Sequence, residues 1–478
     1  MAKLPNSSET VKDPGLGAVG TANNTCVVIG TTGATVKEEL KFYTDPQKLV
    51  DDHVAGPAVD DALHILNVAG GPVGLIASAD SVSAIVGTVT EPNSAEPITL
   101  SGDPLFDTDG FINIVQSGAA GVAKFQYSLD EGRSFSPELT VPLSGTFALP
   151  NGQSLAFGSS NPFSAGDVYT ISGAQCPSIN ATDVQSAMGV LDASPIAWRF
   201  VNLSTSLAAG DATEHALLAI ALQSELDAME VASKYRAGII CTGFDDSEDV
   251  VADFASVEAN RLAIQCGTAI VIGGDPIVGR AFPKLGGGAI HAGSAAAGLI
   301  STDPKRVLNG ALPRVVSLGR DGRVDGGQGL DDINVSTLRT FEGRPGFFIT
   351  QTRIKSQPGS DFTVWPRRIV MDVACEVTHT KQEEFIGRGV RVVDGGFIDN
   401  RDALRFEKEV QDVLDAQLTS PRNAEGTDGH VSDIRYTIAR DDNLLADPTI
   451  RSTVAILPLQ YADYVETQLG FVASIGDN

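Results

Sequence analysis

Short apolar runs alternate with apolar stripes at helical spacing along much of the first two thirds of the chain. The runs predict buried strands, and they lie at residues 25–29, 73–76, 196–203, 237–242 and 268–272. The stripes predict a helix over residues 45–66 and two more, formed by Leu218, Leu222, Leu226 and Met229 and by Val250, Val251, Phe254, Val257 and Leu262. Strands that alternate with helices favour an α/β fold with a mostly parallel sheet.

Between residues 88 and 175 the pattern changes to short segments in which apolar and polar residues alternate. Gly, Pro, Asn and Asp separate these segments, as in PITLSG, FINIVQSG and DVYTISG. This spacing of turn residues predicts a small β-sandwich or barrel. We therefore expect a β-sandwich-like domain over residues 88–175, inserted into an α/β domain of residues 25–87 and 176–330.

Residues 331–478 mix strand and helix patterns and predict an α+β domain. An apolar strand at residues 347–349 leads through a polar loop into a helix that Arg367 and Arg368 open. The apolar face of this helix is formed by Ile369, Val370, Val373 and Val377. A second amphipathic helix is predicted over residues 403–417, and strands are predicted over residues 433–439, 453–459 and 464–471.

In the last predicted strand, Val465, Leu469 and Phe471 alternate with polar residues. We expect a strand that closes the chain to lie at a sheet edge, where an extended segment of another copy can pair with it. An ordinary antiparallel meander within one chain would show the same sequence pattern.

The chain is strongly acidic, with 34 Lys and Arg against 60 Asp and Glu and a net charge of -26. Direct binding of nucleic acid is not expected, because phosphate contacts need clustered cations. Five scattered cysteines without a CxxC pair favour buried free thiols over disulfides or a zinc site. No run of about 18 apolar residues occurs, so we expect no membrane insertion and folding in a cytoplasm.

Catalytic motifs are missing from the sequence. The six histidines form no H-x-x-x-H or H-E-x-x-H pair, and neither a G-x-S-x-G elbow nor a phosphate-binding G-x-x-x-x-G-K-S/T loop occurs. The turn from Gly30 to Gly33 follows a strand and could cradle a phosphate, but it lacks the full dinucleotide spacing and is better explained as a structural turn. His291, among small residues, is interpreted as a packing histidine. We expect that the protein is not an enzyme and binds no cofactor or metal.

Several segments, taken in order, carry a family resemblance. They are the strand and Arg-opened helix within residues 341–377, the small-residue segment 286–300, the Asp303-Pro304 and Leu312-Pro313 steps, and the Ile333-Asn334 pair before a strand. In this order they resemble the contractile tail sheath proteins of phages and related injection particles. The G-x-R-T sequence usual in that family is replaced here by Ile349-Thr350-Gln351-Thr352-Arg353.

The resemblance implies an architecture and a mechanical function. Both chain ends would form an inner α+β domain, with residues 1–24 as an extended arm and Val465, Leu469 and Phe471 in an inter-subunit strand. Arg367 and Arg368 would contact acidic surface on a neighbouring subunit or the tail tube.

The implied partners are further copies in six-fold rings, the tail tube protein, and baseplate and tail terminator proteins. The protein would belong to a virion tail or an extracellular contractile particle, assembled in the cytoplasm of a bacterial host. A nucleotide-binding α/β enzyme using the turn at Gly30 and Gly33, or a non-contractile surface or adhesion protein, are the alternatives.

Overall fold

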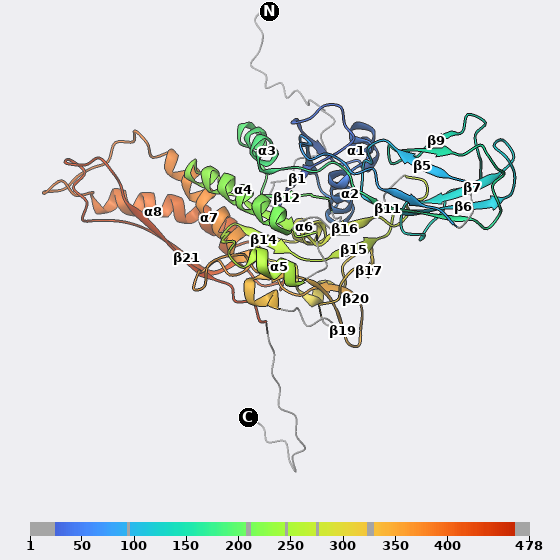
Figure 1. The fold of residues 1–478 in the computed structure, drawn as a ribbon. Helices are drawn as coiled ribbons and strands as arrows, with labels where there is room; N and C mark the ends of the chain where they lie inside the picture. The colour runs from blue at the N-terminus through green and yellow to red at the C-terminus, as the bar shows by residue number, and fades with distance from the viewer. Residues whose placement is uncertain are drawn as a thin grey trace, which may run out of the picture. The chain divides into compact units, whose positions relative to one another are not determined.

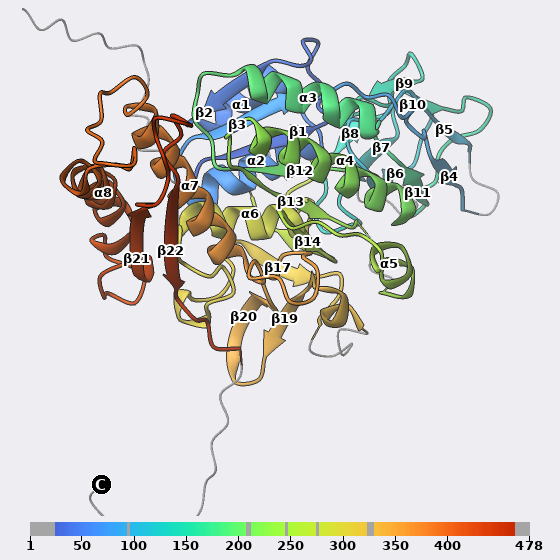
Figure 2. The same ribbon diagram turned by 90° about the vertical axis from the view of Figure 1, so that its left-hand side faces the viewer.

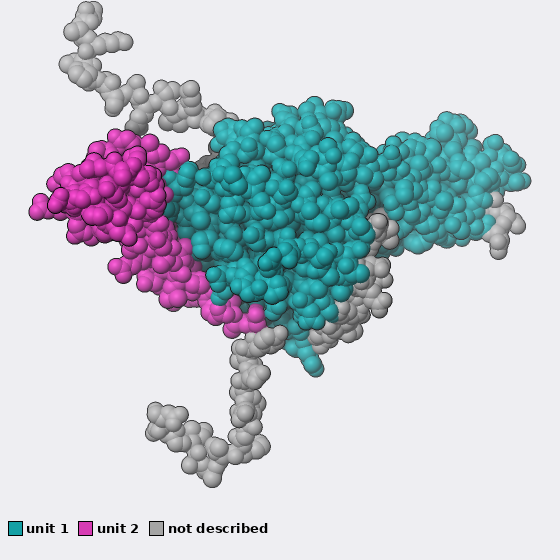
Figure 3. All heavy atoms as spheres, turned by 60° about the vertical axis from the view of Figure 1, so that its left-hand side comes forward, with its two compact units in different colours: residues 1–379 teal, residues 380–478 magenta. Residues whose placement is uncertain are grey.

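The computed structural model of the chain describes residues 24–92, 96–206, 212–243, 247–273, 277–322 and 329–463. The chain forms two compact units, residues 1–379 and residues 380–478 (Figure 3). The predicted arm at residues 1–24 therefore lies outside the described residues except for Asn24, and the predicted strand at residues 464–471 lies outside them entirely.

The first unit is built on a seven-stranded sheet with the order β18-β14-β13-β12-β1-β3-β2 (Figure 1). Its strands are β1 (Cys26–Gly30), β2 (Leu40–Tyr43), β3 (Val73–Ala77), β12 (Phe200–Leu203), β13 (Ala237–Cys241), β14 (Leu262–Gln265) and β18 (Val335–Ser336). All neighbouring strands are parallel except β2 and β3. The five central strands are buried along their whole length, as parallel strands covered on both faces must be. The predicted α/β fold is confirmed.

Helices cover the two faces of this sheet differently. One face packs its apolar side chains against α3 (Ala181–Ala193), α4 (Ala212–Val231) and α5 (Ser247–Phe254) in one large core cluster. The other face is covered by α2 (Pro57–Ala69) and by the small-residue helix α6 (Gly287–Ala297). An added Cβ at Gly288 would lie 3.1 Å from the backbone nitrogen of Cys241, so α6 sits directly on the strands.

Three sequence predictions about this part of the chain were wrong. The helix predicted over residues 45–66 is broken into α1 (Pro46–His53) and α2, because Gly56 has a φ of +140° and Pro57 cannot donate a backbone hydrogen bond.

Leu262 does not belong to a helical stripe, because α5 ends at Phe254 and Leu262 opens β14. Residues 268–272 were expected to form a strand of the parallel sheet. They instead contain β15 (Thr268–Val271), which pairs antiparallel with β16 (Lys284–Gly286) and β17 (Val315–Leu318), because Gly267, with a φ of +95°, turns the chain out of the sheet.

The insertion consists of two antiparallel sheets that share one apolar core, which confirms a β-sandwich. The sheets have the orders β4-β11-β6-β7-β8 and β5-β10-β9. Their strands are β4 (Thr88–Thr90), β5 (Ile98–Ser101), β6 (Thr108–Gln116), β7 (Lys124–Ser128), β8 (Leu139–Thr140), β9 (Thr146–Ala148), β10 (Ser154–Phe157) and β11 (Val168–Ala174). Phe125, Phe157 and Phe163 form an aromatic cluster at the centre of this core. The domain limits predicted at residues 88, 176 and 331 stay predictions.

The predicted strand at residues 347–349 lies in β20 (Arg344–Ile349), which forms a hairpin with β19 (Leu338–Phe341). The Arg-opened helix is α7 (Trp365–Glu383). The ring of Trp365 stands edge-on to Phe200 at 5.3 Å and to His291 at 5.5 Å, measured between ring centroids. The first unit also contains two short 3₁₀ turns, η1 (Val307–Asn309) and η3 (Asp331–Ile333).

A buried ion cluster fixes α7 within the first unit. Asp372 is fully buried and accepts hydrogen bonds from Nη1 of Arg261, at 3.1 Å, and from Nε of Arg368, at 3.0 Å. Arg261 is also fully buried, and its Nη2 lies 2.7 Å from Oε2 of Glu230 on α4. One carboxylate therefore neutralises two buried guanidinium groups, and losing it would leave both without that partner.

The second unit contains α8 (Asn400–Leu414), a π-helical turn η4 (Asp415–Thr419) and the strands β21 (Val431–Ile438) and β22 (Ser452–Pro458). These elements confirm the predicted amphipathic helix and the first two of the three predicted C-terminal strands. Among the described residues of both units, no helix combines the length and the apolar character needed to cross a membrane.

Replacing Asp372 by alanine should lower the free energy of unfolding of the first unit by about 3–5 kcal/mol, because Arg261 and Arg368 lose a buried counter-charge. Urea unfolding followed by tryptophan fluorescence measures this, since both tryptophans of the chain, Trp198 and Trp365, lie in the first unit. Asp192→Ala is the control, because its ion pair with Lys234 is about half exposed and should contribute little. Equal midpoints for the two variants would contradict the assigned importance of the cluster.

Candidate assembly interface

β21 and β22 form a two-stranded antiparallel ribbon, and α8 lies against it (Figure 2). Ile434, Tyr436 and Ile438 of β21 are buried, whereas Arg435 between them is exposed. This alternation is that of a strand with one face on a helix and one face in solvent. α8 contributes the matching apolar stripe, with Phe406, Val410 and Leu414 buried.

The outer edge of β22 has unpaired backbone groups. Tyr436 stands opposite Val454, and Ile434 stands opposite Ile456. The Tyr436 N–H points away from β22 to a side chain of α8, so in an antiparallel ladder the N–H and C=O groups of Val454 and Ile456 point away from β21. Within the described part of the chain, no hydrogen bond reaches these outward groups. Such an edge can accept a further strand.

The end of β22 fits this arrangement. Pro458 ends β22 two residues after Ile456, so it has no N–H to offer at the next position along the edge, and its carbonyl oxygen accepts from the hydroxyl of Ser432 on β21 at 3.1 Å. A proline is tolerated there, because the missing N–H would have no partner in the ribbon. The acceptor edge is therefore formed by Ser452, Val454 and Ile456, and Pro458 closes it at one end.

No family model matches the sequence, and no curated protein matches it. Solved structures match it over nearly its whole length. A chain of the anti-feeding prophage (AFP) baseplate in the contracted state matches with a TM-score of 0.55 at 10% identity, covering 98% of this chain and 99% of the other. A chain of the six-fold symmetrised AFP baseplate matches with a TM-score of 0.53 at 10% identity, covering 99% and 100%.

A chain of the AFP helical sheath in the contracted state also matches, with a TM-score of 0.50 at 11% identity, covering 99% of this chain and 100% of the other. The chain has the fold of a contractile sheath protein. The resemblance carried by the sequence motifs is thus confirmed at the level of the fold. The matched chains come from an AFP baseplate and an AFP helical sheath, which agrees with the expectation of a structural protein.

The two arginines predicted to make outside contacts lie differently in this sheath fold. Arg368 is buried, pairs with Asp372 and stacks over the ring of Phe362, with 4.2 Å from its guanidinium carbon to the ring centroid. Arg367 is half-buried, and its Nη1 lies 3.5 Å from Oγ1 of Thr363. Arg368 is therefore engaged inside its own chain, and the contact of this pair with a tube or a neighbour stays a prediction. Val465, Leu469 and Phe471 lie outside the described residues.

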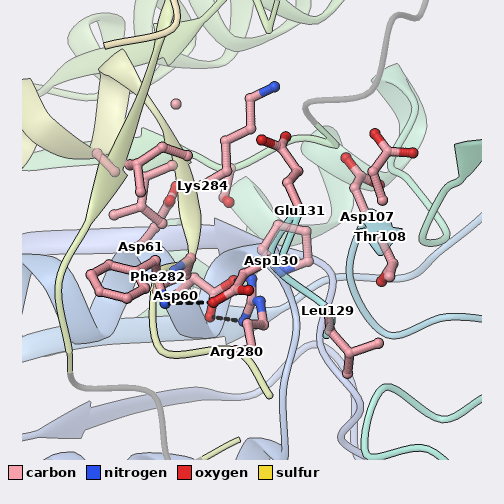
Figure 4. A pocket seen from close by; sticks show the side chains of 18 of the residues that line it. Asp60, Asp61, Asp107, Thr108, Leu129, Asp130, Glu131, Arg280, Phe282 and Lys284 are labelled. Atoms are coloured by element: carbon pink, nitrogen blue, oxygen red, sulfur yellow. Dashed lines mark hydrogen bonds and ion pairs between the residues drawn. The ribbon is translucent and has the colours of Figure 1, made fainter. Parts of the chain in front are cut away.

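A cavity of about 370 Å³ opens between the parallel sheet and the inserted sandwich (Figure 4). Ser204, Thr205 and Cys241 line it from the carboxyl ends of β12 and β13, and Asp60 and Asp61 line it from α2. This place is close to β1, where the strand order reverses, and open α/β sheets commonly bind ligands at such a point. Sequence patterns did not indicate this cavity, because the residues that line it come from distant segments of the chain.

In this chain, residues of the insertion line the crevice. Asp107 of the insertion accepts hydrogen bonds from the hydroxyl of Ser206, at 2.7 and 2.8 Å, and from the backbone nitrogen of Cys176, at 3.0 Å. Arg280 is buried, donates to Asp60 from Nη1 at 3.0 Å, and lies over the ring of Phe106 at 3.8 Å from its centroid. The guanidinium thus joins α2 to the core of the sandwich.

The segment around Arg280 is bonded along its backbone to the β6–β7 side of the sandwich. The carbonyl of Gly279 accepts from the nitrogen of Leu129 at 2.7 Å, and a carboxylate oxygen of Asp130 accepts from the nitrogen of Ala281 at 3.1 Å. Gly279 has a φ of +78°, and an added Cβ would lie 2.9 Å from the ring of Tyr127. Glycine is required at this position, because both the conformation and the close contact exclude a side chain.

The other positions singled out in the sequence have structural roles. An added Cβ at Gly30 would lie 2.6 Å from the carbonyl oxygen of Ser204, and the Gly33 nitrogen donates to Ala55 at 2.7 Å. The turn is therefore packed against its own chain rather than open to a phosphate, and the nucleotide-site alternative is not supported. Burial lowers the pKa of His291 to about 3, so the ring packs against Trp365 in its neutral form. Four of the five cysteines are buried free thiols, as predicted.

The buried Asp61 beside the cavity predicts a pH dependence of stability. Burial raises the pKa of Asp61 from 3.8 to about 7, so the folded protein retains a proton that the unfolded chain loses between about pH 4 and pH 7. Stability should therefore fall as the pH rises through this window and level off above it. Asp61→Asn should leave the melting temperature unchanged near pH 4 and raise it at pH 8.

Thermal melting at the two pH values, followed by tryptophan fluorescence, measures this difference. Asp60→Asn is the matched control, because that carboxylate is the partner of Arg280, and its neutralisation should destabilise the protein at pH 8. A melting temperature of Asp61→Asn that stays at or below the wild-type value at pH 8 would contradict the assignment.

Proposed function

We propose that this chain polymerises as the sheath of a contractile tail, around an inner tail tube, and that contraction drives the tube through the envelope of a target cell. Two observations support the proposal together. The chain matches a sheath structure from end to end, and its second unit presents a strand edge that has no partner among the described residues. The proposal depends on the open edge, because its unpaired backbone groups can bond a strand from outside the ribbon.

The strand that fills this edge comes, in our proposal, from another copy of the chain. Val465, Leu469 and Phe471 are separated by even numbers of residues, so in an extended strand their side chains lie on one face. Val454 and Ile456 of β22 are half-buried on the face that β21 turns to α8. An added strand with one apolar face would continue this layer while its backbone fills the edge.

The same exchange gives the inner domain its two chain ends. The arm at residues 1–24 and the C-terminal strand would each tie a subunit to a neighbour, and the inner domain would then contain segments from several copies. A contact that does not close on itself repeats as a helix of subunits. The strands act as joints, and the first units rotate as bodies between the extended and the contracted lattice.

The partners follow from this arrangement. They are further copies in six-fold rings, the tail tube protein inside the sheath, and baseplate and tail terminator proteins at its ends. The assembled particle would be a phage tail or an extracellular injection particle, made in the cytoplasm of its bacterial host. The extended sheath must be kinetically trapped above the contracted one in free energy, since contraction performs work without a bound fuel.

The full chain, purified alone, should assemble into tubes of uniform width under negative-stain electron microscopy. A chain lacking residues 1–24 should fold and remain as single subunits, because it lacks one of the two exchanged segments. Circular dichroism and tryptophan fluorescence check the fold of the truncated chain. A full chain that stays a compact single particle at high concentration would point to the adhesion alternative and overturn the proposal.

Ile456→Pro tests the open edge itself. The substitution removes the outward N–H at the centre of the acceptor edge without removing a hydrogen bond to β21. Tubes should disappear while the subunit keeps its folded fluorescence spectrum. Ile456→Ala, like the proline variant, shortens the apolar side chain, but it keeps the N–H, so it should still form tubes. Normal tubes from the proline variant would show that the β22 edge takes no part in assembly.

A further inference from the structure

The two edges of the β21–β22 ribbon are chemically different, and this difference rests on α8. We propose that Gln411 and Glu407 of α8 close the β21 edge, so that exchanged strands can add only at β22. The inference depends on the proposed strand exchange and deepens it, because it fixes the strand order of the assembled sheet as β21-β22-added strand. It makes Gln411 and Glu407 the residues that set the specificity of the joint.

Gln411 takes the place that a neighbouring strand would occupy. Its Oε1 accepts from the backbone nitrogen of Tyr436 at 2.9 Å, and its Nε2 donates to the carbonyl oxygen of Ile434 at 2.9 Å. A side-chain amide carries the same donor and acceptor as a peptide group. One glutamine therefore satisfies an outward N–H and an outward C=O of β21, two residues apart, as the backbone of an added strand does.

Glu407 and Arg440 close the next position along the same edge. Oε1 of Glu407 accepts from the backbone nitrogen of Ile438 at 2.7 Å, and Nη1 of Arg440 donates to the carbonyl oxygen of Ile438 at 2.8 Å. Glu407 and Arg440 also form an ion pair at 2.8 Å, which holds both caps in place. At the other end of the edge, the nitrogen of Ile434 donates to the carboxylate of Asp433 at 2.9 Å.

The contrast with β22 is complete for the N–H donors of the described ribbon. The outward nitrogens of Ile434, Tyr436 and Ile438 each have a side-chain acceptor. No hydrogen bond among the described residues reaches those of Val454 and Ile456 directly across from them.

An unprotected ribbon could accept strands on either edge, which would allow branching and side-by-side association of subunits. Capping one edge with side chains of the same unit prevents branching and side-by-side association without weakening strand addition at the other edge.

Electron cryomicroscopy of tubes assembled from the wild-type chain tests the strand order directly. The added strand should lie next to β22 in every subunit, with Gln411 still bonded to Tyr436. A strand added next to β21, or strands on both edges, would overturn the inference while leaving the proposed sheath function intact. Absence of tubes would instead count against the proposed function.

A variant pair tests the cap independently of the wild-type tubes. Gln411→Met keeps the length of the side chain and removes both hydrogen bonds, which opens the β21 edge. It should turn uniform tubes into branched or bundled aggregates, whereas Gln417→Met, at an exposed glutamine next to the same helix, should leave the tubes uniform. Uniform tubes from Gln411→Met would overturn the inference.

Hydrogen exchange in the Ile456→Pro background, where subunits stay single, gives a readout that does not need assembly. Peptides from β21 should exchange more slowly than peptides from β22. Adding Gln411→Met should speed exchange in β21 by about tenfold, the effect of losing one typical hydrogen bond, and leave β22 unchanged. Equal exchange in the two strands before the change would overturn the inference, and it would do so even if no tubes form.

Discussion

A strand edge with unpaired N–H and C=O groups is the constraint on which the second unit depends. Backbone polar groups in a folded protein are almost always paired, and a ribbon of two strands has two open edges. The chain caps the β21 edge with side chains of its own unit, and the β22 edge has no strand partner among the described residues. The described ribbon is thus an incomplete sheet, which in our proposal another copy completes.

The rest of the second unit is held by polar pairs around a small aromatic contact. Phe385 and Phe406 stack with ring centroids 4.4 Å apart, and Arg388 above them donates to both oxygens of Glu409 at 2.8 and 3.2 Å. The double hydrogen bond from Arg391 holds the pKa of Asp402 well below its usual range. These bonds fix α8, and α8 in turn places the caps on β21. The specificity of the proposed joint would therefore depend on the same contacts that fold the unit.

The pattern of apolar residues was sufficient to predict the parallel sheet, the inserted sandwich and the Arg-opened helix. It failed where the decisive contact is distant in sequence. Asp372 is four residues from Arg368, which the sequence shows, but its second partner, Arg261, is 111 residues away. The family resemblance therefore predicts outside contacts for Arg367 and Arg368, although Arg368 belongs to the core. Likewise Gln411 and Tyr436 are 25 residues apart. Nothing in the sequence indicates that a glutamine on a helix makes the hydrogen bonds of a neighbouring strand. β14 was missed because Leu262 also fits the helical stripe before it.

A joint made of backbone hydrogen bonds, as we propose for this chain, places few demands on sequence, which fits a fold shared at 10% identity with the matched AFP chains. Every residue except proline offers the same donor and acceptor, so an added strand needs only one apolar face and no particular sequence. Each hydrogen bond contributes roughly 0.5–1.5 kcal/mol net, so one added strand is a modest contact and many strands along a tube are a strong one. In the proposed contraction, the side-chain contacts between rotating bodies would change. The exchanged strands would not, and for that reason the joint could be general while the surfaces around it diverge.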